Sequence, residues 1–334
     1  IRDSSKARRY PWTGRGDLNT YALFAEHFLN LTNAKGAAGV VVPTGISTDA
    51  TTAPFFGHLV SNQRLARLVD FENSKPLFAG VHRSFKFALM TLGAGVKEAG
   101  FAFFLTDPSQ LDDSRRCFNL SPEQILTINP NTRTAPLFRS NMDAELCAKI
   151  YRNCMPIQKL GDQGYDSGLR VKRFFDVNRQ EVLALLTEKR LDDTCQMWEG
   201  KLFWQFDNRH ATYANGQVEA VPSSCKNTEF IPAPRYWLRQ NEVLSRLADA
   251  NWHCKWIIGL RDLTNATNER TVVASALPIG GTDYTVRTLL SDRPIFSEIF
   301  LSIANSLVFD FVARTKIGGM HLAEFVFQQL PIIE

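Results

Sequence analysis

The sequence predicts an α/β fold for its first third and an α+β domain for the rest. Residues 18–33 carry apolar side chains at helical spacing, and residues 38–43 form a short, continuously apolar run closed by a proline. Such a run is typical of a parallel strand that is buried on both faces. Helix, turn and strand together make half of a βαβ unit.

The next two strands are joined without a helix. Residues 64–71 and 85–92 both have strand-like patterns, and the segment between them is too short for a crossover helix. Two such strands must be antiparallel neighbours, so we expect the sheet to be parallel until its last strand turns back. A further strand is predicted at residues 101–105.

Capping residues indicate where the helices begin and end. Asp17 can accept the first free N–H groups of the first helix, and Gly36 stands where that helix is expected to end. On this helix we expect Tyr21 in the core and Glu26 in solvent. Asp49 and the threonines after it can cap a second helix. Its apolar residues are Pro54, Phe55, Phe56, Leu59 and Val60.

The predicted domain boundary is the polar and charged stretch at residues 106–116, which separates residues 1–105 from residues 117–334. Beyond it, Ser121 and Ser140 open two short helices with capping boxes. The capping pattern therefore predicts that the second domain begins with helices.

Aromatic-rich segments broken by Gly, Pro and Asn fill residues 165–236. This texture predicts short strands and long loops, with helices restricted to residues 179–187 and 240–249. Near the end, the apolar residues 294–312 predict a helix that Asp292 caps and that breaks at Asn305-Ser306. No run of about 18 apolar residues exists, so we expect no transmembrane span.

The composition is that of a soluble globular protein, with 334 residues, 44% of them apolar and 22% charged. The formal net charge of +4 is too mild to identify nucleic-acid binding, so any DNA-binding face must be a local patch. The six cysteines form no CxxC pair, which indicates a reducing cytosol. The six histidines are dispersed, and no metal site is predicted.

Six blocks in fixed order resemble the DNA adenine-N6 methyltransferases of the gamma class, as found in type IIG and related restriction-modification and phage-defence systems. The blocks cover most of the chain, and long blocks in order are more specific than any short motif. They are residues 16–60, 64–93, 128–140, 199–213, 259–278 and 304–331.

The resemblance implies a site-specific DNA methyltransferase that flips an adenine out of duplex DNA and methylates its N6 from S-adenosylmethionine. Residues 1–105 would be the C-terminal half of its Rossmann-like methyltransferase sheet, and residues 117–334 its target-recognition domain. Double-stranded DNA is the implied partner, with other restriction-modification or defence subunits as further candidates. A non-catalytic DNA-specificity or interaction protein with the same architecture is the alternative.

Two motifs of the resembled family are missing. Such enzymes bind S-adenosylmethionine at a glycine-rich turn and hold the adenine with an Asn-Pro-Pro-Tyr loop. Asn129-Pro130 is followed by Asn131 and Thr132, so it is no substitute. By the resemblance, the chain is the C-terminal portion of a longer enzyme, most of the cofactor site lies outside it, and we expect no catalytic residue in it and no activity from it alone.

Three residues are expected near the active site. The resemblance assigns Phe78 to stacking on the flipped adenine, which needs an aromatic face because the base has lost its neighbours. The alternative is a loop phenylalanine that plugs the sheet edge. Thr44 and Ser47 follow the carboxyl end of a strand, where ligands of open α/β sheets bind, so we expect them to border the active-site cleft.

Six residues of the second domain are DNA-binding candidates. Asn265, Asn268 and Arg270 can contact bases in a bidentate manner. The alternative is a polar turn between two strands whose side chains cap their own backbone. Phosphate contacts are expected near two glycines that allow close approach, although a loop that ends a helix would look the same. The candidates for them are Arg314, Lys316 and His321.

Overall fold

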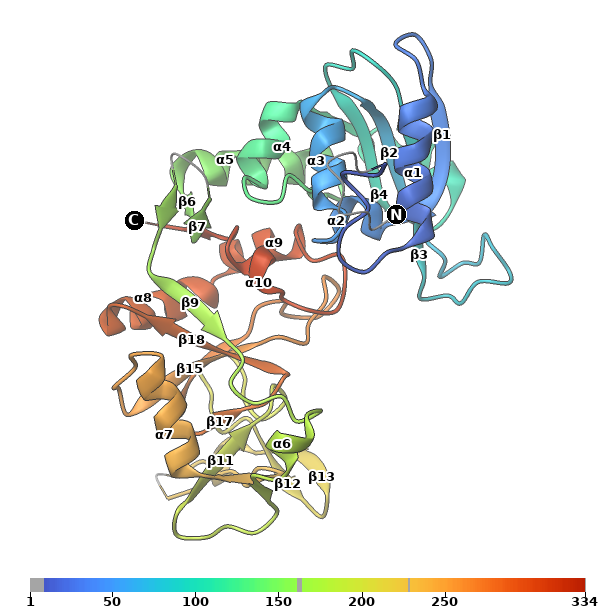
Figure 1. The fold of residues 1–334 in the computed structure, drawn as a ribbon. Helices are drawn as coiled ribbons and strands as arrows, with labels where there is room; N and C mark the ends of the chain where they lie inside the picture. The colour runs from blue at the N-terminus through green and yellow to red at the C-terminus, as the bar shows by residue number, and fades with distance from the viewer. Residues whose placement is uncertain (1–8, 161–163, 228, 334) are drawn as a thin grey trace. The chain divides into compact units, whose positions relative to one another are not determined.

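A computed structural model describes residues 9–160, 164–227 and 229–333. The chain divides into two compact units, and Figure 1 shows their elements. Unit 1 contains Ile1–Tyr165, Thr315–Gly318 and Ile333–Glu334. Unit 2 contains Asp166–Arg314 and Gly319–Ile332.

Unit 1 is built on a five-stranded sheet in the order β1-β3-β2-β4-β5. β3 is antiparallel to both β1 and β2, β4 is parallel to β2, and β5 is antiparallel to β4. The carboxyl ends of β1, β2 and β4 therefore share one edge of the sheet. The strands are β1 (Ala38–Pro43), β2 (Leu65–Glu72), β3 (Lys86–Leu92), β4 (Ala99–Leu105) and β5 (Phe118–Leu120).

The predicted pairing of the two strands that lack a crossover helix is confirmed, because β2 and β3 are antiparallel neighbours. The expectation that the sheet stays parallel until its last strand is wrong. β3 lies between β1 and β2, and β4 continues beyond β2 in the parallel direction. A strand that returns directly can pair on either side of its neighbour, and sequence order does not decide which.

The prediction for residues 38–43 is also wrong. β1 is an edge strand whose side chains alternate between buried and exposed, with an antiparallel neighbour on one side. α1 lies against β1, so the strand is covered without being enclosed (Figure 1). Apolar residues can also occupy the exposed positions of an edge strand, so a continuous apolar run does not require that both faces are buried.

Helices and short strands complete unit 1. The predicted apolar face of α3 is confirmed, since Phe55, Phe56 and Leu59 are fully buried. Both predicted capping boxes are present, at Ser121 and at Ser140. The elements are α1 (Thr20–Leu31), α2 (Gly45–Thr48), α3 (Ala53–Ser61), the 3-10 helix η1 (Pro108–Asp112), α4 (Pro122–Ile128), α5 (Asn141–Asn153), β6 (Met155–Pro156) and β7 (Gln158–Lys159).

The first helix differs in detail from its prediction. Asn19 rather than Asp17 is its N-cap, and the Asn19 side chain accepts from the Tyr21 N–H at 3.4 Å. Asn caps as well as Asp does, and here it stands two residues closer to the helix. Glu26 is buried rather than solvated, because its carboxylate accepts from the Thr13 N–H at 2.8 Å and from the Thr13 hydroxyl at 2.6 Å.

Residues 106–116, the predicted domain boundary, connect β4 to β5 within the unit 1 sheet. The two compact units instead divide between Tyr165 and Asp166. A polar stretch marks exposed chain, and here that chain is a connection inside one sheet. The functional assignment of the two parts remains a prediction.

Unit 2 contains two four-stranded sheets, in the orders β16-β15-β18-β9 and β10-β14-β11-β17, and a β12-β13 hairpin. Their buried side chains form a core around Trp198, Phe203 and Trp252. The strands are β9 (Leu169–Lys172), β10 (Leu186–Thr187), β11 (Thr194–Trp198), β12 (Ala211–Ala214), β13 (Gln217–Ala220), β14 (Trp237–Arg239), β15 (Trp256–Arg261), β16 (Ala274–Pro278), β17 (Gly281–Thr282), β18 (Val286–Ser291) and β19 (Pro331–Ile332), and β8 (Tyr165–Asp166) lies where the units divide.

Short strands and long connections fill residues 165–236, as predicted. The predicted helix at residues 240–249 is confirmed to the residue, and the helix predicted at 179–187 is shorter. The helices are α6 (Gln180–Leu183), the 3-10 helix η2 (Ser223–Cys225), α7 (Gln240–Asp249), α8 (Pro294–Ala304), α9 (Leu307–Arg314) and α10 (Glu324–Phe327).

The predicted break at Asn305-Ser306 separates α8 from α9 with a bend of 74°. Arg293 rather than Asp292 occupies the N-cap position of α8 and makes no side-chain capping hydrogen bond. Pro294 follows it at the helix start, where proline is favoured because its fixed φ suits a helix. Within the described ranges, no single helix is long and apolar enough to cross a membrane, although α8 and α9 taken together have the length and composition.

Candidate functional site

The carboxyl ends of the three parallel strands of unit 1 are joined by hydrogen bonds. The Thr44 hydroxyl, at the end of β1, donates to the Asp70 carboxylate in β2. The Phe104 N–H, in β4, donates to the other Asp70 oxygen at 3.3 Å. Burial raises the pKa of Asp70, and these two hydrogen bonds oppose the rise. This is the edge at which ligands of open α/β sheets bind.

Thr44 and Ser47 are engaged within the protein. Ser47 is fully buried, and its hydroxyl donates to the Thr44 carbonyl at 3.0 Å. A Cβ on Gly45 would lie 2.3 Å from an Asp49 carboxylate oxygen and 3.3 Å from the Tyr21 hydroxyl, so those side chains fill the space above the glycine. Both hydroxyls therefore fix the end of β1, and their place beside an active-site cleft stays a prediction.

Phe78 lies in the loop between β2 and β3, which the buried Asn73 holds in shape. The Asn73 amide donates to the carbonyls of Phe78 at 3.1 Å and Val81 at 2.8 Å, and its oxygen accepts from the Phe78 N–H at 3.1 Å. The Phe78 ring meets Phe87 edge to face, with ring centroids 4.9 Å apart. The Phe78 ring is 46% exposed, so Phe87 supports one part of it and the rest is open to solvent.

Two cations at the same edge were not singled out in the sequence. Lys86 pairs with Glu72 at 3.0 Å, and its ammonium lies 5.2 Å from the centre of the Phe104 ring. The Arg139 guanidinium lies 4.5 Å from the same ring. Lys86 directly precedes Phe87 in β3, so positive charge stands close to the Phe78 loop.

In unit 2, residues 262–273 form a loop between β15 and β16 that is bonded to α9. The Asp310 carboxylate accepts from the N–H groups of Thr271 at 2.7 Å and Val272 at 2.8 Å. Arg314 donates to Asp310 at 2.8 Å and to the carbonyls of Ala266 at 3.1 Å and Glu269 at 2.7 Å. Arg314, a predicted phosphate contact, therefore holds the loop.

The three predicted base-reading residues sit in this loop with different freedom. The Asn265 oxygen accepts from the N–H of Thr267 at 2.8 Å and from its hydroxyl at 2.7 Å, which is the turn-capping role. The Asn268 amide makes a long hydrogen bond of 3.4 Å to the Thr264 hydroxyl. One terminal nitrogen of Arg270 is buried and has no hydrogen-bond partner among the described residues. The side chains of Asn268 and Arg270 are therefore held by fewer hydrogen bonds than that of Asn265.

The loop begins at Asp262, a fully buried carboxylate that contacts two arginines and a histidine. Arg173 contacts it through Nε at 3.0 Å, Arg287 through Nε at 3.1 Å, and His321 through Nδ1 at 3.1 Å. Burial lowers the pKa of Arg287. The side chains of Arg173 and His321 are 40% and 50% exposed. His321 thus lies beside the loop, and its DNA-binding role stays a prediction. Arg173 lies at the same carboxylate and was not predicted.

Lys316, the third predicted phosphate contact, belongs to unit 1. Its ammonium is buried, donates to the Ile128 carbonyl and the Asn129 side-chain oxygen, and lies 4.7 Å from the centre of the Tyr151 ring. Burial lowers the pKa of Lys316 to about 8. The charge of Lys316 therefore faces the interior of unit 1.

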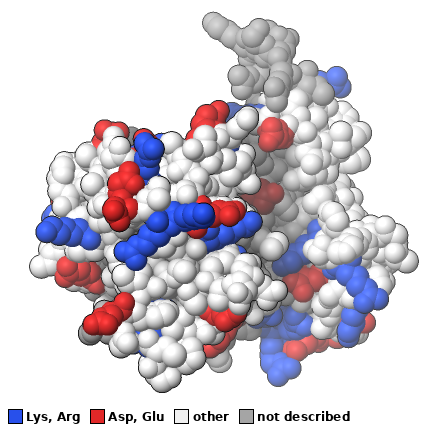
Figure 2. Space-filling model, turned by 90° about the horizontal axis from the view of Figure 1, so that it is seen from below, with Lys and Arg blue, Asp and Glu red and all other residues white. Residues whose placement is uncertain are grey.

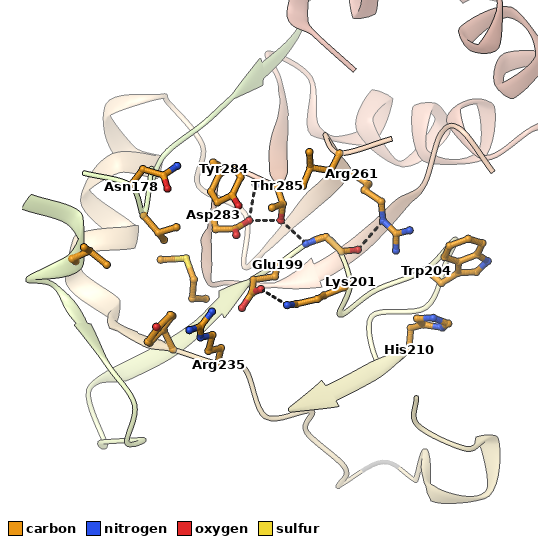
Figure 3. Close-up of a pocket in the computed structure, with 16 residues that line it drawn as sticks. Asn178, Glu199, Lys201, Trp204, His210, Arg235, Arg261, Asp283, Tyr284 and Thr285 are labelled. Atoms are coloured by element: carbon orange, nitrogen blue, oxygen red, sulfur yellow. Dashed lines mark hydrogen bonds and ion pairs between the residues drawn. The ribbon is translucent and has the colours of Figure 1, made fainter. Parts of the chain in front are cut away.

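Unit 2 also contains a cavity of about 730 Å³ that no sequence pattern predicted (Figure 3). It is named the Asp283 cavity here, and its polar lining includes Glu199, Lys201, Arg235, Asp283 and Thr285. These residues are scattered over more than eighty positions of the chain. In the part of the chain that the structure describes, no group of three or more His, Cys, Asp or Glu side chains could hold a metal ion.

The surface charge is mixed. On the face drawn in Figure 2, lysines and arginines gather in separate groups with acidic side chains beside them. This distribution agrees with the formal charge of +4 and the expectation that any DNA-binding face is a local patch. The six cysteines are all free.

No known protein family and no curated protein matches this chain. Among solved structures it is similar to the type IIG restriction endonuclease BpuSI, with 12% identity, a TM-score of 0.34, and coverage of 97% of this chain and 43% of that one. It is also similar to the type IIL restriction-modification enzyme MmeI, with 10% identity, a TM-score of 0.45, and coverage of 92% and 41%. The chain thus spans less than half the length of either.

Proposed function

We propose that this chain is part of a site-specific DNA methyltransferase that transfers a methyl group from S-adenosylmethionine to adenine N6, with unit 2 selecting the DNA sequence. Unit 1 would be the C-terminal half of the methyltransferase domain, and its exposed aromatic residue would receive the flipped adenine. The residues that carry this proposal are those around Phe78.

The observation with most weight is that Phe78 is exposed and yet held in place. An exposed phenylalanine costs stability unless something covers it, so a loop fixed by three hydrogen bonds from one buried asparagine indicates a use for the ring. Phe87 supports the edge of Phe78, and Phe71 stacks on Phe87 at 5.4 Å. A base that has left the duplex can stack on such an aromatic ring in place of its former neighbours.

The cations near this loop suit the rest of a flipped nucleotide. A flipped nucleotide carries phosphates on both sides, and these need positive charge at the mouth of the site. Lys86 and the exposed Arg139 supply it at the sheet edge where β2 and β4 end.

Unit 1 has an uncovered apolar surface, which supports its being one part of a larger domain. Val41 of β1 is 59% exposed, and its partner in register, Leu89 of β3, is exposed on the same face. On α1 and just before it, the exposed large apolar residues are Leu18, Phe24, Phe28 and Leu31. β1 pairs with β3 along one side, and its other side has no strand among the described residues. A surface of this kind is typical of an interface.

The residues at the sheet edge do not form a site for S-adenosylmethionine. The hydroxyls of Thr44 and Ser47 bond within the protein, and the space above Gly45 is filled by Asp49 and Tyr21. We therefore assign no step of methyl transfer to these residues. In this proposal the cofactor is held by the segment that covers the apolar surface of unit 1.

The test compares DNA duplexes with and without one unpaired adenine. A duplex in which adenine faces an abasic site should bind more tightly than the paired duplex, because the base can reach Phe78 without breaking a pair. Phe78→Ala should lose about 1–3 kcal/mol of this preference, or roughly 5- to 150-fold in affinity. Phe24→Ala, which removes another exposed phenylalanine, is the matched control. Equal preference in wild type and Phe78→Ala would refute the stacking role.

A further inference from the structure

The Asp283 cavity lies wholly within unit 2. Its walls come from the turn after β11, the turn between β17 and β18, and the chain just before β14. Figure 3 shows the Asp283 carboxyl and the Arg235 guanidinium entering it from opposite sides, with Glu199 and Lys201 between them. A volume of about 730 Å³ is in the range of small-molecule sites.

Asp283 is held firmly but only through one oxygen. That oxygen accepts from the Thr285 N–H at 2.8 Å and from the Thr285 hydroxyl at 2.5 Å. The Thr285 hydroxyl in turn accepts from the Gly200 N–H at 2.8 Å. Asp283 is only 4% exposed, and its second oxygen has no hydrogen-bond partner among the described residues and faces the cavity (Figure 3). An acceptor that is open to the cavity in this way can receive a hydrogen bond from a ligand.

The second acid of the cavity is already paired. Glu199 accepts from the Tyr213 hydroxyl at 2.9 and 3.0 Å and pairs with Lys201 at 3.1 Å. Glu199 and Lys201 therefore neutralise each other. Arg235 stacks on the Tyr236 ring at 5.0 Å and has no carboxylate partner among the described residues. One buried acceptor and one free cation remain for a ligand.

The rest of the lining is mostly aromatic and apolar, with Asn178 and Arg261 as further polar residues. Trp204 stacks with His210 at 5.5 Å, and Arg261 lies 4.9 Å from the Trp204 ring. Tyr236 and Tyr284 add further rings. Aromatic walls favour a flat, partly apolar ligand, because its faces pack on rings while its edge makes the hydrogen bonds.

We propose that the Asp283 cavity binds a nucleotide whose base carries an amino group. The amino N–H would donate to the free Asp283 oxygen, the phosphate would meet Arg235, and the base would pack on the aromatic lining. The nucleotide can be free or an unpaired unit of a DNA strand. The second source deepens the proposed DNA-binding function of unit 2 and rests on it, whereas the first does not.

The first experiment titrates the intact protein with the four deoxynucleoside monophosphates at pH 8.5 and follows binding by calorimetry. Burial raises the pKa of Asp283 to about 7, so its free oxygen is an acceptor at this pH. Those of adenine, cytosine and guanine should bind about 5- to 150-fold more tightly than that of thymine, which lacks an amino group. Asp283→Asn should remove this difference or reverse it, because the asparagine amide donates toward the cavity. Asp192→Asn, a change of the same kind at an exposed aspartate outside the cavity, should leave it intact.

Arg235→Ala separates the phosphate contact from the base contact. It should weaken each monophosphate while leaving the corresponding nucleoside unaffected. Equal affinity for all four nucleotides in the wild type, or an unchanged preference in Asp283→Asn, would overturn the assignment.

The second arm distinguishes the two sources with oligonucleotides. Tighter binding of a short single-stranded oligo(dC) than of deoxycytidine monophosphate, lost in Asp283→Asn, identifies a DNA strand as the source. Binding of the monophosphate alone keeps the cavity assignment and identifies a free nucleotide. Duplex binding that persists while no mononucleotide binds leaves the proposed function standing and removes the cavity from it.

Discussion

Replacing Asp283 by asparagine should make the protein more stable at neutral and alkaline pH. Burial raises the pKa of Asp283 from 3.8 to about 7, the hydrogen bonds from Thr285 oppose the rise, and Glu199 and Lys201 act on it in opposite directions. His210, Arg235 and Arg261 are the other titratable or charged groups that line the cavity. Asparagine keeps the oxygen that Thr285 donates to and removes the ionisable group.

The size of the effect follows from the pKa. Between pH 4 and pH 7 the native state keeps a proton that the unfolded chain has lost, so the free energy of unfolding falls as the pH rises. At about 1.36 kcal/mol per pKa unit, the loss from Asp283 approaches 4 kcal/mol at pH values above 7. Asp283→Asn lacks this loss. The variant and the wild type should therefore be alike near pH 4 and differ by a few kcal/mol at pH 8.

Urea unfolding at half-unit steps from pH 4.5 to pH 8.5 measures this directly. Asp192→Asn controls for the removal of one negative charge and should follow the wild-type curve. Parallel curves for the wild type and Asp283→Asn would show that Asp283 is ionised without cost. A variant less stable than the wild type at pH 8 would show that the carboxylate is needed for folding, and either result would refute the argument.

The remaining predictions concern loops, one buried cation and the cofactor. Asn73→Ala should abolish the preference for unpaired adenine as Phe78→Ala does, because the loop loses its three hydrogen bonds, and should lower the free energy of unfolding by about 1–3 kcal/mol in urea. Lys316 has a pKa lowered to about 8, so the free energy of unfolding should rise by about 3 kcal/mol between pH 8 and pH 10.5 in the wild type and stay level in Lys316→Met. Asp310→Ala leaves two backbone N–H groups without an acceptor and should cost about 2–4 kcal/mol in the same assay. Arg270→Ala should weaken binding to the preferred DNA site by about 1–3 kcal/mol and to random duplex far less, and equal loss on both over a salt series would identify a phosphate contact instead. Calorimetry should detect no binding of S-adenosylmethionine by this chain, and micromolar binding would mean that the site is built differently.

Local sequence patterns predicted those features that local contacts determine. The helix at Gln240–Asp249 was placed to the residue because its apolar positions recur at the helical period. The capping boxes at Ser121 and Ser140 join residues only three positions apart. The antiparallel pairing of β2 with β3 followed from the length of the segment between them. None of these features needed knowledge of the rest of the chain.

Burial and strand order depend on residues far away in the sequence. Glu26 has the polarity of a surface residue, and hydrogen bonds from Trp12 and Thr13, fourteen and thirteen positions before it, make its burial possible. Lys316 is buried because Ile128 and Asn129 accept its hydrogen bonds from 188 and 187 positions away, respectively. The position of β3 between β1 and β2 is likewise a choice that no local pattern records.

The Asp283 cavity escaped the sequence for a related reason. Arg235 and Asp283 approach the same space from different connections, and neither belongs to a motif. An aspartate two residues before a threonine is common in turns, and here the Thr285 N–H does donate to one oxygen of Asp283. The role of the other Asp283 oxygen can be inferred only when the position of Arg235 across the cavity is known.

The charges around the 262–273 loop indicate how unit 2 could meet DNA although two of its predicted phosphate contacts are engaged elsewhere. A guanidinium whose donors are bonded to a carboxylate and two carbonyls, as in Arg314, has little left for a phosphate. At Asp262 the donors outnumber the acceptors, because two guanidinium groups and a histidine contact one buried carboxylate. Arg173 and His321 are half exposed there, so their outward N–H groups remain available while Asp262 fixes their positions. A side chain that is both exposed and fixed loses little side-chain entropy on binding. We therefore expect Arg173 and His321 to be better candidates for a phosphate contact than Lys316 and Arg314.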